Sequence, residues 1–425
     1  LSKNLETSSQ TLLPFLKERK RKNFKWKLRF LKSYAILFYI EKGFNIMEFQ
    51  IGPIRPPSEA NSLLLRVTEN CPWNKCKFCM LYKTKQFHTR TVEEIKKDID
   101  AMAYYRDEIQ KYNHNGTFDI PAIQKEFDNL PTNSQKECYY MVFHWITEGN
   151  CQAIFLQDAN TLVLKIEWLT EIIKYIRQKL PEIKRITSYA RADTLCRITE
   201  EQFLQLKSAG LNRIHSGFET GCDEVLQLIG KGTTQKQQIE GGKKVKQAGI
   251  ELSIYFMPGA GGKQYSEKNA IDTATVINAI NPDFVRLRTF VVKNGSLMHD
   301  LVKSGEFIEC SDMEKLLEIK MMLEHIQHCN GYLASDHIIN LLQNVNGYLD
   351  KDKNTMLDYI NTFLALPRKT QRKYQIARRM GFAGDWTMLD KLSMHYQYTI
   401  EQYEKNVPDG EQFEMLLNQY MDNYI

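Results

Sequence analysis

From residue 62 onward, short runs rich in β-branched and aromatic residues alternate with segments of helical periodicity. This alternation constrains the fold most strongly, because parallel strands need crossover connections that are long enough to hold a helix. Six such units predict an α/β fold, a partial (β/α)6 barrel of TIM-like type rather than a closed eight-fold one. A doubly wound sheet shows the same alternation, so this alternative stays open. The strands are expected at residues 62–68, 153–158, 185–190, 212–218, 250–257 and 283–291.

Helix boundaries between these strands carry capping signals. Thr91-Val-Glu-Glu94 and Thr199-Glu-Glu-Gln202 both have the pattern of a capping box, and Gly210 is a typical helix end. A third helix is predicted by apolar residues with a period near 3.6, at Ile166, Leu169, Ile172, Ile173 and Ile176.

The domain organisation follows from where predicted strands and helices alternate along the chain. Residues 47–300 are expected to form the barrel, with an insertion at about 107–150 in its first unit. After about residue 300 the strand signal vanishes, and Ser311-Asp-Met-Glu314 caps a strongly periodic helix. Residues 301–425 are therefore expected to be a helical C-terminal extension.

Residues 1–46 form a basic N-terminal extension, with 11 Lys and Arg against 3 Asp and Glu. The remaining chain has 46 basic and 48 acidic residues, which does not favour a nucleic-acid-binding body. We find no signal-peptide cleavage site in this extension. Its alternatives are upstream sequence read in frame before a natural start at Met47, or a basic surface-binding helix. No apolar run approaches the roughly 20 residues of a membrane-spanning helix.

Three of the nine cysteines crowd into one loop, directly after the first predicted strand. Cys71, Cys76 and Cys79 have the spacing C-x4-C-x2-C, which lets three thiolates converge on an iron–sulfur cluster with one position left open. A zinc site would want a fourth ligand, and His88 is the nearest candidate. Sparse, unpaired cysteines are typical of a reducing compartment, so a cytoplasmic location is expected.

This cysteine loop resembles that of the radical S-adenosylmethionine (radical SAM) superfamily, in particular the branch of Elongator-type, methylthiotransferase and coproporphyrinogen-dehydrogenase proteins. The resemblance covers roughly residues 51–300 and implies a [4Fe–4S] cluster on the three cysteines with S-adenosylmethionine on its fourth iron. The usual spacing is C-x3-C-x2-C, so this chain has one extra residue between Cys71 and Cys76.

The resemblance also implies cofactor-binding residues at successive strand ends. Phe78 matches an aromatic of the cysteine loop, and Asp158 stands where the family has a Glu that contacts the methionine amino group. Arg191 and Glu219 follow the third and fourth strands, and Gly259 would allow the adenosine to approach the backbone. A packing aromatic, and buried ion pairs or strand-end caps for the charged residues, are the structural alternatives.

An enzyme is thereby implied, in which an external electron donor such as flavodoxin or ferredoxin reduces the cluster and a 5′-deoxyadenosyl radical takes hydrogen from a substrate. The sequence does not identify this substrate, the oligomeric state, or whether S-adenosylmethionine is recycled. A small molecule is favoured, because no RNA-binding domain like that of the tRNA-modifying relatives is visible. The six other cysteines stand alone, which argues against auxiliary clusters. The alternatives are an RNA-modifying radical SAM enzyme and a non-enzymatic iron–sulfur or zinc-binding protein.

Three further features bear on the substrate. Arg286 and Arg288 alternate with Leu287 and so share one face of the sixth strand, where they could hold an anion. Ser335-Asp-His337 offers a possible proton donor. The basic run Arg368–Arg379 either forms a solvated helical face or meets phosphates of RNA.

Overall fold

The computed structural model describes residues 47–421, so the basic N-terminal extension lies outside the described residues. The described residues from Glu48 onward form one compact unit. Within the described part, no helix is long and apolar enough to cross a membrane.

The unit is built on one eight-stranded sheet, in the order β1-β6-β7-β8-β9-β10-β11-β12. All neighbours are parallel except β12, which pairs antiparallel with β11. The six predicted strands are confirmed, and their sequential order has no switch point, so the doubly wound alternative is wrong. The strands are β1 (Leu63–Arg66), β6 (Ala153–Gln157), β7 (Arg185–Arg191), β8 (Arg213–Glu219), β9 (Glu251–Phe256), β10 (Phe284–Leu287), β11 (Tyr332–Ala334) and β12 (Gly347–Tyr348).

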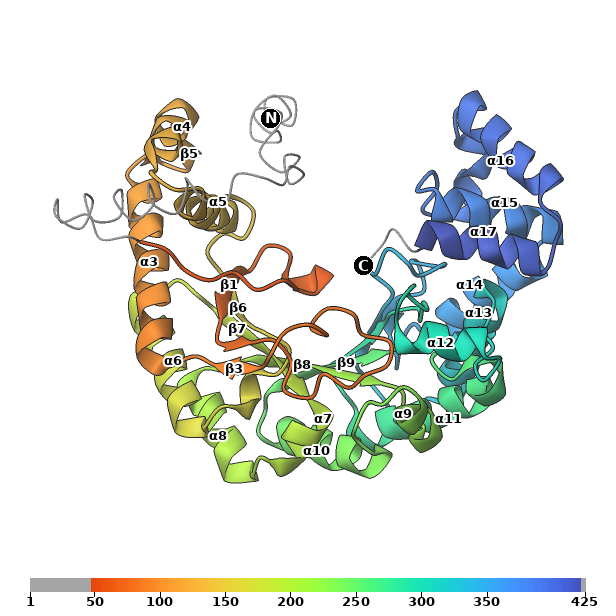
Figure 1. Cartoon of the computed structure of the whole chain (residues 1–425), viewed down its shortest axis with the longest axis horizontal. Helices are drawn as coiled ribbons and strands as arrows, with labels where there is room; N and C mark the ends of the chain where they lie inside the picture. Colours follow the sequence, from red (N-terminus) through yellow and green to blue (C-terminus); the bar gives the residue numbers. More distant parts are fainter. Residues whose placement is uncertain (1–46, 422–425) are drawn as a thin grey trace. The chain divides into compact units, whose positions relative to one another are not determined.

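Helices follow the strands and cover one face of this sheet (Figure 1). The capping boxes expected at Thr91, Thr199 and Ser311 are all present, and Gly210 ends α8 with φ 116°. The helices of the barrel are α3 (Val92–Gln110), α6 (Ile166–Lys179), α7 (Ala192–Arg197), α8 (Glu200–Ala209), α9 (Asp223–Leu228), α10 (Gln235–Gln247), α11 (Gly262–Ile280), α12 (Leu297–Lys303) and α13 (Asp312–His325).

The stretch expected as an insertion follows α3 and precedes β6. It holds a small hairpin and two helices, of which α5 packs on α3 and β1. Its elements are β4 (Asn113–His114), β5 (Thr117–Phe118), α4 (Ile120–Asn129) and α5 (Asn133–Thr147).

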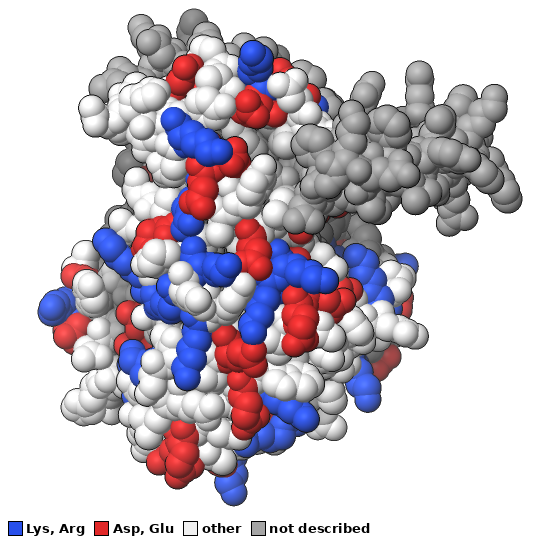
Figure 2. Space-filling model, turned by 90° about the vertical axis from the view of Figure 1, so that its left-hand side faces the viewer, with Lys and Arg blue, Asp and Glu red and all other residues white. Residues whose placement is uncertain are grey.

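The face of the unit that carries α3 shows basic and acidic side chains side by side (Figure 2). Ion pairs join α3 to α6 and the loop after it, between Lys96 and Glu171 at 2.5 Å and between Arg106 and Glu182 at 2.8 Å. This face therefore has no one-sign surface of the kind that binds nucleic acid.

The other face of the sheet is polar, because it faces the interior of the partial barrel. Phe155, Tyr189, His215 and Tyr255 meet there, with ring centroids 4.9–6.2 Å apart. The alternate residues, such as Ile186, Ile214 and Leu252, are fully buried toward the helices.

Glu59, on the short 3-10 helix η2 (Pro57–Glu59), is buried against the amino-terminal part of this polar face. It lies 3.1 Å from Arg185 and 3.4 Å from the Nε2 atom of His215. Burial opposes its ionisation, but the bonds from His215 and Ser62 and the charge of Arg185 hold the pKa of Glu59 at about 2.

The segment after residue 300 is not purely helical. β11 extends the main sheet as a seventh parallel strand, and β12 adds an edge, so the expectation of helices alone is wrong there. Both strands are very short, which is why no alternating pattern marks them. The helices beyond them are α14 (Lys353–Ala365), α15 (Arg368–Arg379), α16 (Met394–Asn406) and α17 (Glu411–Met421), with the 3-10 helix η4 (Trp386–Lys391) between α15 and α16.

The basic run Arg368–Arg379 is α15, in which Arg368 and Lys369 are exposed while Arg372, Arg378 and Arg379 are buried and do not form a solvated or phosphate-binding surface. Arg379 is buried in an ion pair with Asp312 of α13. Arg378 donates to the carbonyl oxygens of Asn340, at 3.1 Å, and Ile338, at 2.7 Å, and Arg372 to that of Glu404, at 3.0 Å. These arginines hold the C-terminal helices to the barrel, so the run does not support the RNA alternative.

We expect Arg379→Gln to destabilise the fold by about 3–5 kcal/mol, because it leaves the Asp312 charge buried without its partner. The matched control is Lys373→Gln on the same helix, whose partner Glu401 is half exposed. It should cost about 0–1 kcal/mol. Urea unfolding of both variants measures the difference, and equal costs would contradict the structural role of Arg379.

Candidate functional site

The three cysteines of the C-x4-C-x2-C motif lie on the loop between the two-residue strands β2 (Thr68–Glu69) and β3 (His88–Thr89). All three are free thiols, with Cys76 buried and Cys71 and Cys79 partly exposed. We call residues 70–82 the cysteine loop. It follows β1, at the carboxyl ends of the parallel strands, where this kind of sheet binds its ligands.

Asp158, the residue after β6, holds both ends of the cysteine loop. One carboxylate oxygen of this fully buried side chain accepts the Asn70 N–H at 2.9 Å and pairs with Arg66 at 3.0 Å. The other oxygen accepts the Tyr82 hydroxyl. Asn70 directly precedes Cys71, and Tyr82 follows Cys79 by three residues.

Both Asp158 oxygens are therefore engaged within the described residues. The expected role as partner of a methionine amino group is not supported by this arrangement, which makes Asp158 a positioning residue for the loop. Burial and the Asp158 carboxylate both raise the pKa of Tyr82, so this hydroxyl remains a hydrogen-bond donor at neutral pH.

The middle of the cysteine loop docks against the segment that follows α9. The Lys77 N–H donates to the Ile229 carbonyl at 2.8 Å, and the Trp73 Nε1–H donates to the Gly230 carbonyl at 2.8 Å. Gly232, with φ 69°, packs so closely on the Trp73 ring that a Cβ atom would stand 2.1 Å from it. Only glycine fits there.

Two of the residues expected to bind the cofactor, Arg191 and Glu219, meet beside this docked loop. The Arg191 guanidinium lies 5.1 Å from the Trp73 ring centroid, and it donates to the Lys231 carbonyl at 2.6 Å. Lys231 in turn pairs with Glu219 at 2.6 Å. Burial raises the pKa of Cys76, while the charges of Lys231 and Arg191 act in the opposite direction, toward the thiolate.

Phe78, the third expected residue, packs edge-on against Phe290 with centroids 6.0 Å apart. It joins a buried apolar cluster at the ends of β9 and β10, which includes Met257 and Phe307. The packing role that the sequence left open is thus present, and it anchors the cysteine loop to the far side of the barrel.

Gly259, the fourth, is engaged by α13 instead of facing open space. Its N–H donates to Glu318 at 3.0 Å, and a Cβ atom would stand 2.8 Å from the Lys315 side chain. Gly259 has a positive φ of 88°, which favours glycine. A close approach to its backbone does occur, but the approaching group is a lysine of the same chain. The expected role in binding adenosine is not supported by this packing.

Two observations bear on the two metal alternatives. Three thiolates on one tetrahedral zinc lie about 4 Å apart, whereas the thiolates of a cluster bind different irons and stand wider. Among residues 47–421, the cysteine loop contributes to no group of three or more His, Cys, Asp or Glu side chains with ligand atoms within 4.8 Å of one another. His88, the candidate fourth ligand for zinc, is exposed and pairs in β3 with Glu69. Three free thiols on one anchored loop therefore suit a cluster better than a zinc ion.

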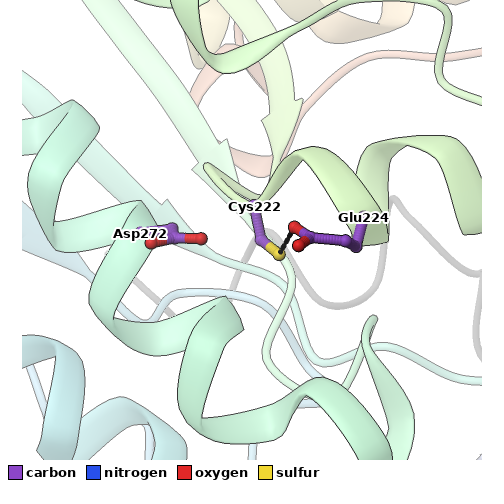
Figure 3. Close-up of side chains that lie close together, drawn as sticks. All are labelled: Cys222, Glu224 and Asp272. Carbon is purple, nitrogen blue, oxygen red and sulfur yellow. Dashed lines mark hydrogen bonds between the residues drawn. The ribbon is translucent and has the colours of Figure 1, made fainter.

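Cys222, Glu224 and Asp272 do lie within 4.8 Å of one another, but they are not arranged to receive a metal (Figure 3). The Cys222 thiol donates to Glu224 at 3.2 Å, and burial raises its pKa to about 12. Lys268 already neutralises Glu224.

Residues 126–274 match the family model described as the Radical SAM superfamily. This segment of the chain is therefore similar to the radical SAM family, and the predictions of an enzyme and of a [4Fe–4S] cluster and S-adenosylmethionine as the cofactors of this family are confirmed. The cysteine loop lies before the matched segment, so the residues that bind these cofactors stay predictions.

The curated relatives are distant and longer than the matched region. A tRNA uridine(34) acetyltransferase of Methanocaldococcus jannaschii is 25% identical over 109 residues, which are 25% of this chain and 20% of that protein. The heme chaperone HemW of Bacillus subtilis is 23% identical over 160 residues, 37% of this chain and 41% of that protein. The chain thus spans less than half the length of either relative.

Among solved structures, an archaeal Methanocaldococcus infernus Elp3 with an N-terminal deletion aligns with a TM-score of 0.37 and 17% identity. The alignment covers 51% of this chain and 55% of that one.

Sequence reasoning missed the residues that hold the cysteine loop in place. Asn70 and Tyr82 flank the motif and carry no signal of their own. Trp73 inside the motif, beside the later pair Gly230 and Gly232, is the one available hint, because glycines mark close backbone approach.

Asp158→Asn should loosen the cysteine loop, because it removes the charge that pairs with Arg66 and weakens the bonds to Asn70 and Tyr82. Hydrogen exchange of peptides covering residues 66–86 should rise at least tenfold in the variant. The control Glu69→Gln lies next to the loop but outside this set of bonds, and should leave exchange unchanged. Equal protection in Asp158→Asn and wild type would refute the anchoring role.

Glu318 should make the fold less stable as the pH rises toward neutrality. Burial raises its pKa to about 7 against the opposing bonds from Gly259, Ser266 and Asn269. The folded chain then holds a proton that the unfolded chain releases near pH 4.5, so this contribution is fully present below pH 4.5 and is lost as the pH rises through about 7.

The expected size of this loss is of the order of 1–3 kcal/mol. Glu318→Gln removes the titration, so its stability should fall less than that of the wild type between pH 5 and pH 7.5 in urea unfolding. Parallel curves for the two proteins would show that Glu318 does not titrate in this range.

Proposed function

We propose that this chain is a radical SAM enzyme in which Cys71, Cys76 and Cys79 hold a [4Fe–4S] cluster at the carboxyl ends of the barrel strands. The observation that supports this most directly is three free cysteines on one loop, fixed at both ends by Asp158 and in the middle by the Gly230 carbonyl. When bound, the cluster would supply the electron that cleaves S-adenosylmethionine into methionine and a 5′-deoxyadenosyl radical, and this radical would abstract hydrogen from the substrate.

The protein's own residues position and shield this chemistry. Asp158 fixes the loop ends, and the Arg191–Lys231–Glu219 group places two cations and a carboxylate beside Cys76. Phe78 and the apolar cluster around Phe290 exclude water from one side of the loop. Gly259 and Phe78 support the site by packing, so we assign them no direct contact with a cofactor.

The expected partners are a small-molecule substrate and an external low-potential electron donor such as flavodoxin or ferredoxin. Free cysteines and an oxygen-sensitive cluster require a reducing compartment, for which we propose the cytoplasm. RNA modification remains a second candidate, because one relative is named as a tRNA uridine acetyltransferase. The buried α15 arginines argue against it.

Cys76→Ala should abolish both iron binding and turnover, because each thiolate is required to hold one iron. The experiment reconstitutes the protein with iron and sulfide under anaerobic conditions and measures iron content and 5′-deoxyadenosine formed with S-adenosylmethionine and dithionite. We expect about four irons per chain in the wild type. Cys196→Ala, which removes a partly exposed cysteine of α7, should keep both activities.

Bound zinc without cleavage of S-adenosylmethionine would overturn the proposal in favour of a metal-binding protein. An intact cluster that neither binds nor cleaves S-adenosylmethionine would favour a non-enzymatic iron–sulfur protein.

A further inference from the structure

Six arginines lie along the polar face of the sheet, and five of them have a carboxylate partner. The pairs are Arg66 with Asp158, Arg185 with Glu59, Arg191 with Asp193, Arg213 with Glu251 and Arg286 with Asp336, at distances of 2.6–3.1 Å. The sixth is Arg288. Within residues 47–421 its guanidinium makes no ion pair and no hydrogen bond, although other groups are close enough to feel its charge.

Backbone register puts Arg288 on the inner face, one step beyond Arg286 toward the carboxyl ends of the strands. Its N–H donates to the Phe256 carbonyl at 2.9 Å, which continues the ladder between β9 and β10. Residues two apart in an extended strand share a face, so Arg288 follows Arg286 on the inner face, and both guanidinium charges act on the Tyr255 hydroxyl. The side chain is partly exposed and therefore accessible.

Three neutral hydrogen-bonding groups lie close enough to this guanidinium to feel its charge. Arg288 acts electrostatically on the hydroxyls of Tyr189 and Tyr255 and on the imidazole of His337. Within the described residues, the buried Tyr255 hydroxyl has no hydrogen bond of standard geometry, although the Tyr189 hydroxyl interacts with it as a hydrogen-bonding group. All three side chains are partly exposed as residues, like Arg288 itself.

The pKa of His337 responds to the charge near Arg288. His337 lies in the loop after β11, where burial and the charges of Arg288 and Arg378 lower its pKa to about 4. The adjacent Asp336 is already paired with Arg286, and Arg378 is bonded to the carbonyls of Ile338 and Asn340. A neutral imidazole among cations is suited to donate a hydrogen bond to an anion.

We propose that Arg288, Tyr255 and His337 form a subsite that binds an anionic group of the substrate, a carboxylate or a phosphate. A guanidinium recognises either group with two parallel N–H donors, and the Tyr255 hydroxyl and His337 imidazole add two more donors. This inference rests on the proposed function for the identity of the ligand as substrate, but anion binding itself can be measured without the cluster.

The position of Arg288 separates this subsite from the groups beside Cys76. Arg191 is on β7 and Arg288 is next to β10, three strands further along the sheet. With neighbouring strands about 4.8 Å apart, their backbones are about 14 Å apart along the sheet. The cations next to the cysteine loop and the Arg288 subsite can therefore hold two different ligands at one edge of the barrel.

The test follows the His337 imidazole by NMR in the full chain labelled with ¹³C-histidine, without iron. Its resonance is recorded from pH 5 to pH 8 with no anion, with inorganic phosphate and with acetate. Without an anion, His337 should stay neutral over this range. A bound anion should raise its pKa by about one pH unit or more and bring the titration into the range.

The decisive variant is Arg288→Gln, which should lose the anion-dependent change. The matched control is Arg213→Gln, which removes an inner-face arginine at the opposite end of its strand and should keep it. If Arg288→Gln does not fold, Tyr255→Phe replaces it and should weaken anion binding several-fold. A response to phosphate alone identifies a phosphate ester, and a response to acetate alone identifies a carboxylic acid.

No response of the wild type to either anion, or the same response in Arg288→Gln, would overturn the subsite. These outcomes are independent of the cluster. An enzyme that cleaves S-adenosylmethionine but shows no anion response keeps the proposed function and loses the subsite, and the converse result loses the function alone.

Discussion

The buried carboxylate of Asp158 is the interaction on which the proposed site depends. A loop of thirteen residues with three thiols has many conformations, and fixing each residue costs about 1–2 kcal/mol of backbone entropy. Asp158 restricts the conformations of the loop, because its single side chain binds Asn70 before the first cysteine and Tyr82 after the last. Docking of Trp73 on the Gly230 carbonyl then fixes the middle of the loop. The three cysteines are thus held in place by contacts with a neighbouring strand end and not by their own sequence.

The same principle of paired charge organises the interior of the barrel. A parallel sheet in sequential order has its helices on one side, so its inner face must be filled by something other than helices. Here it is filled by aromatic rings and by arginines. Each buried arginine needs an anionic partner. Glu59 supplies that anion at the amino-terminal ends of the strands. At the carboxyl ends of the strands, Arg288 has no carboxylate partner among the described residues. An anionic ligand can therefore bind there.

Much of the fold could be predicted from the sequence, because it follows from local periodicity. The six long strands, the capping boxes and the apolar face of α6 were all visible in their residues. β11 and β12 were not, since strands of three and two residues leave no alternating pattern. The basic run of α15 was misjudged for a different reason. Composition marks charge but not burial, and Arg379 finds its partner Asp312 67 residues away.

The candidate site divides in the same way. Cys71, Cys76 and Cys79 could be singled out as the predicted cluster ligands because three thiols so close together in one loop are typical of a metal or iron–sulfur site. The roles of Asp158 and Gly259 could not, because a carboxylate or a glycine at a strand end is equally suited to a ligand and to the protein itself. In the structure, Asp158 binds Arg66 and Tyr82, and Gly259 contacts α13, so both residues contact the protein itself. These contacts depend on tertiary structure.

The way in which α15 holds the loop after β11 affects how this protein can change during evolution. Arg378 and Arg379 bind the carbonyl oxygens of Ile338, Ile339 and Asn340, atoms that every amino acid possesses. Ile338 is half exposed, so its side chain can be replaced while the main chain keeps its shape. The rim of the barrel beside His337 therefore tolerates sequence drift, and new specificities can arise there without a loss of foldability.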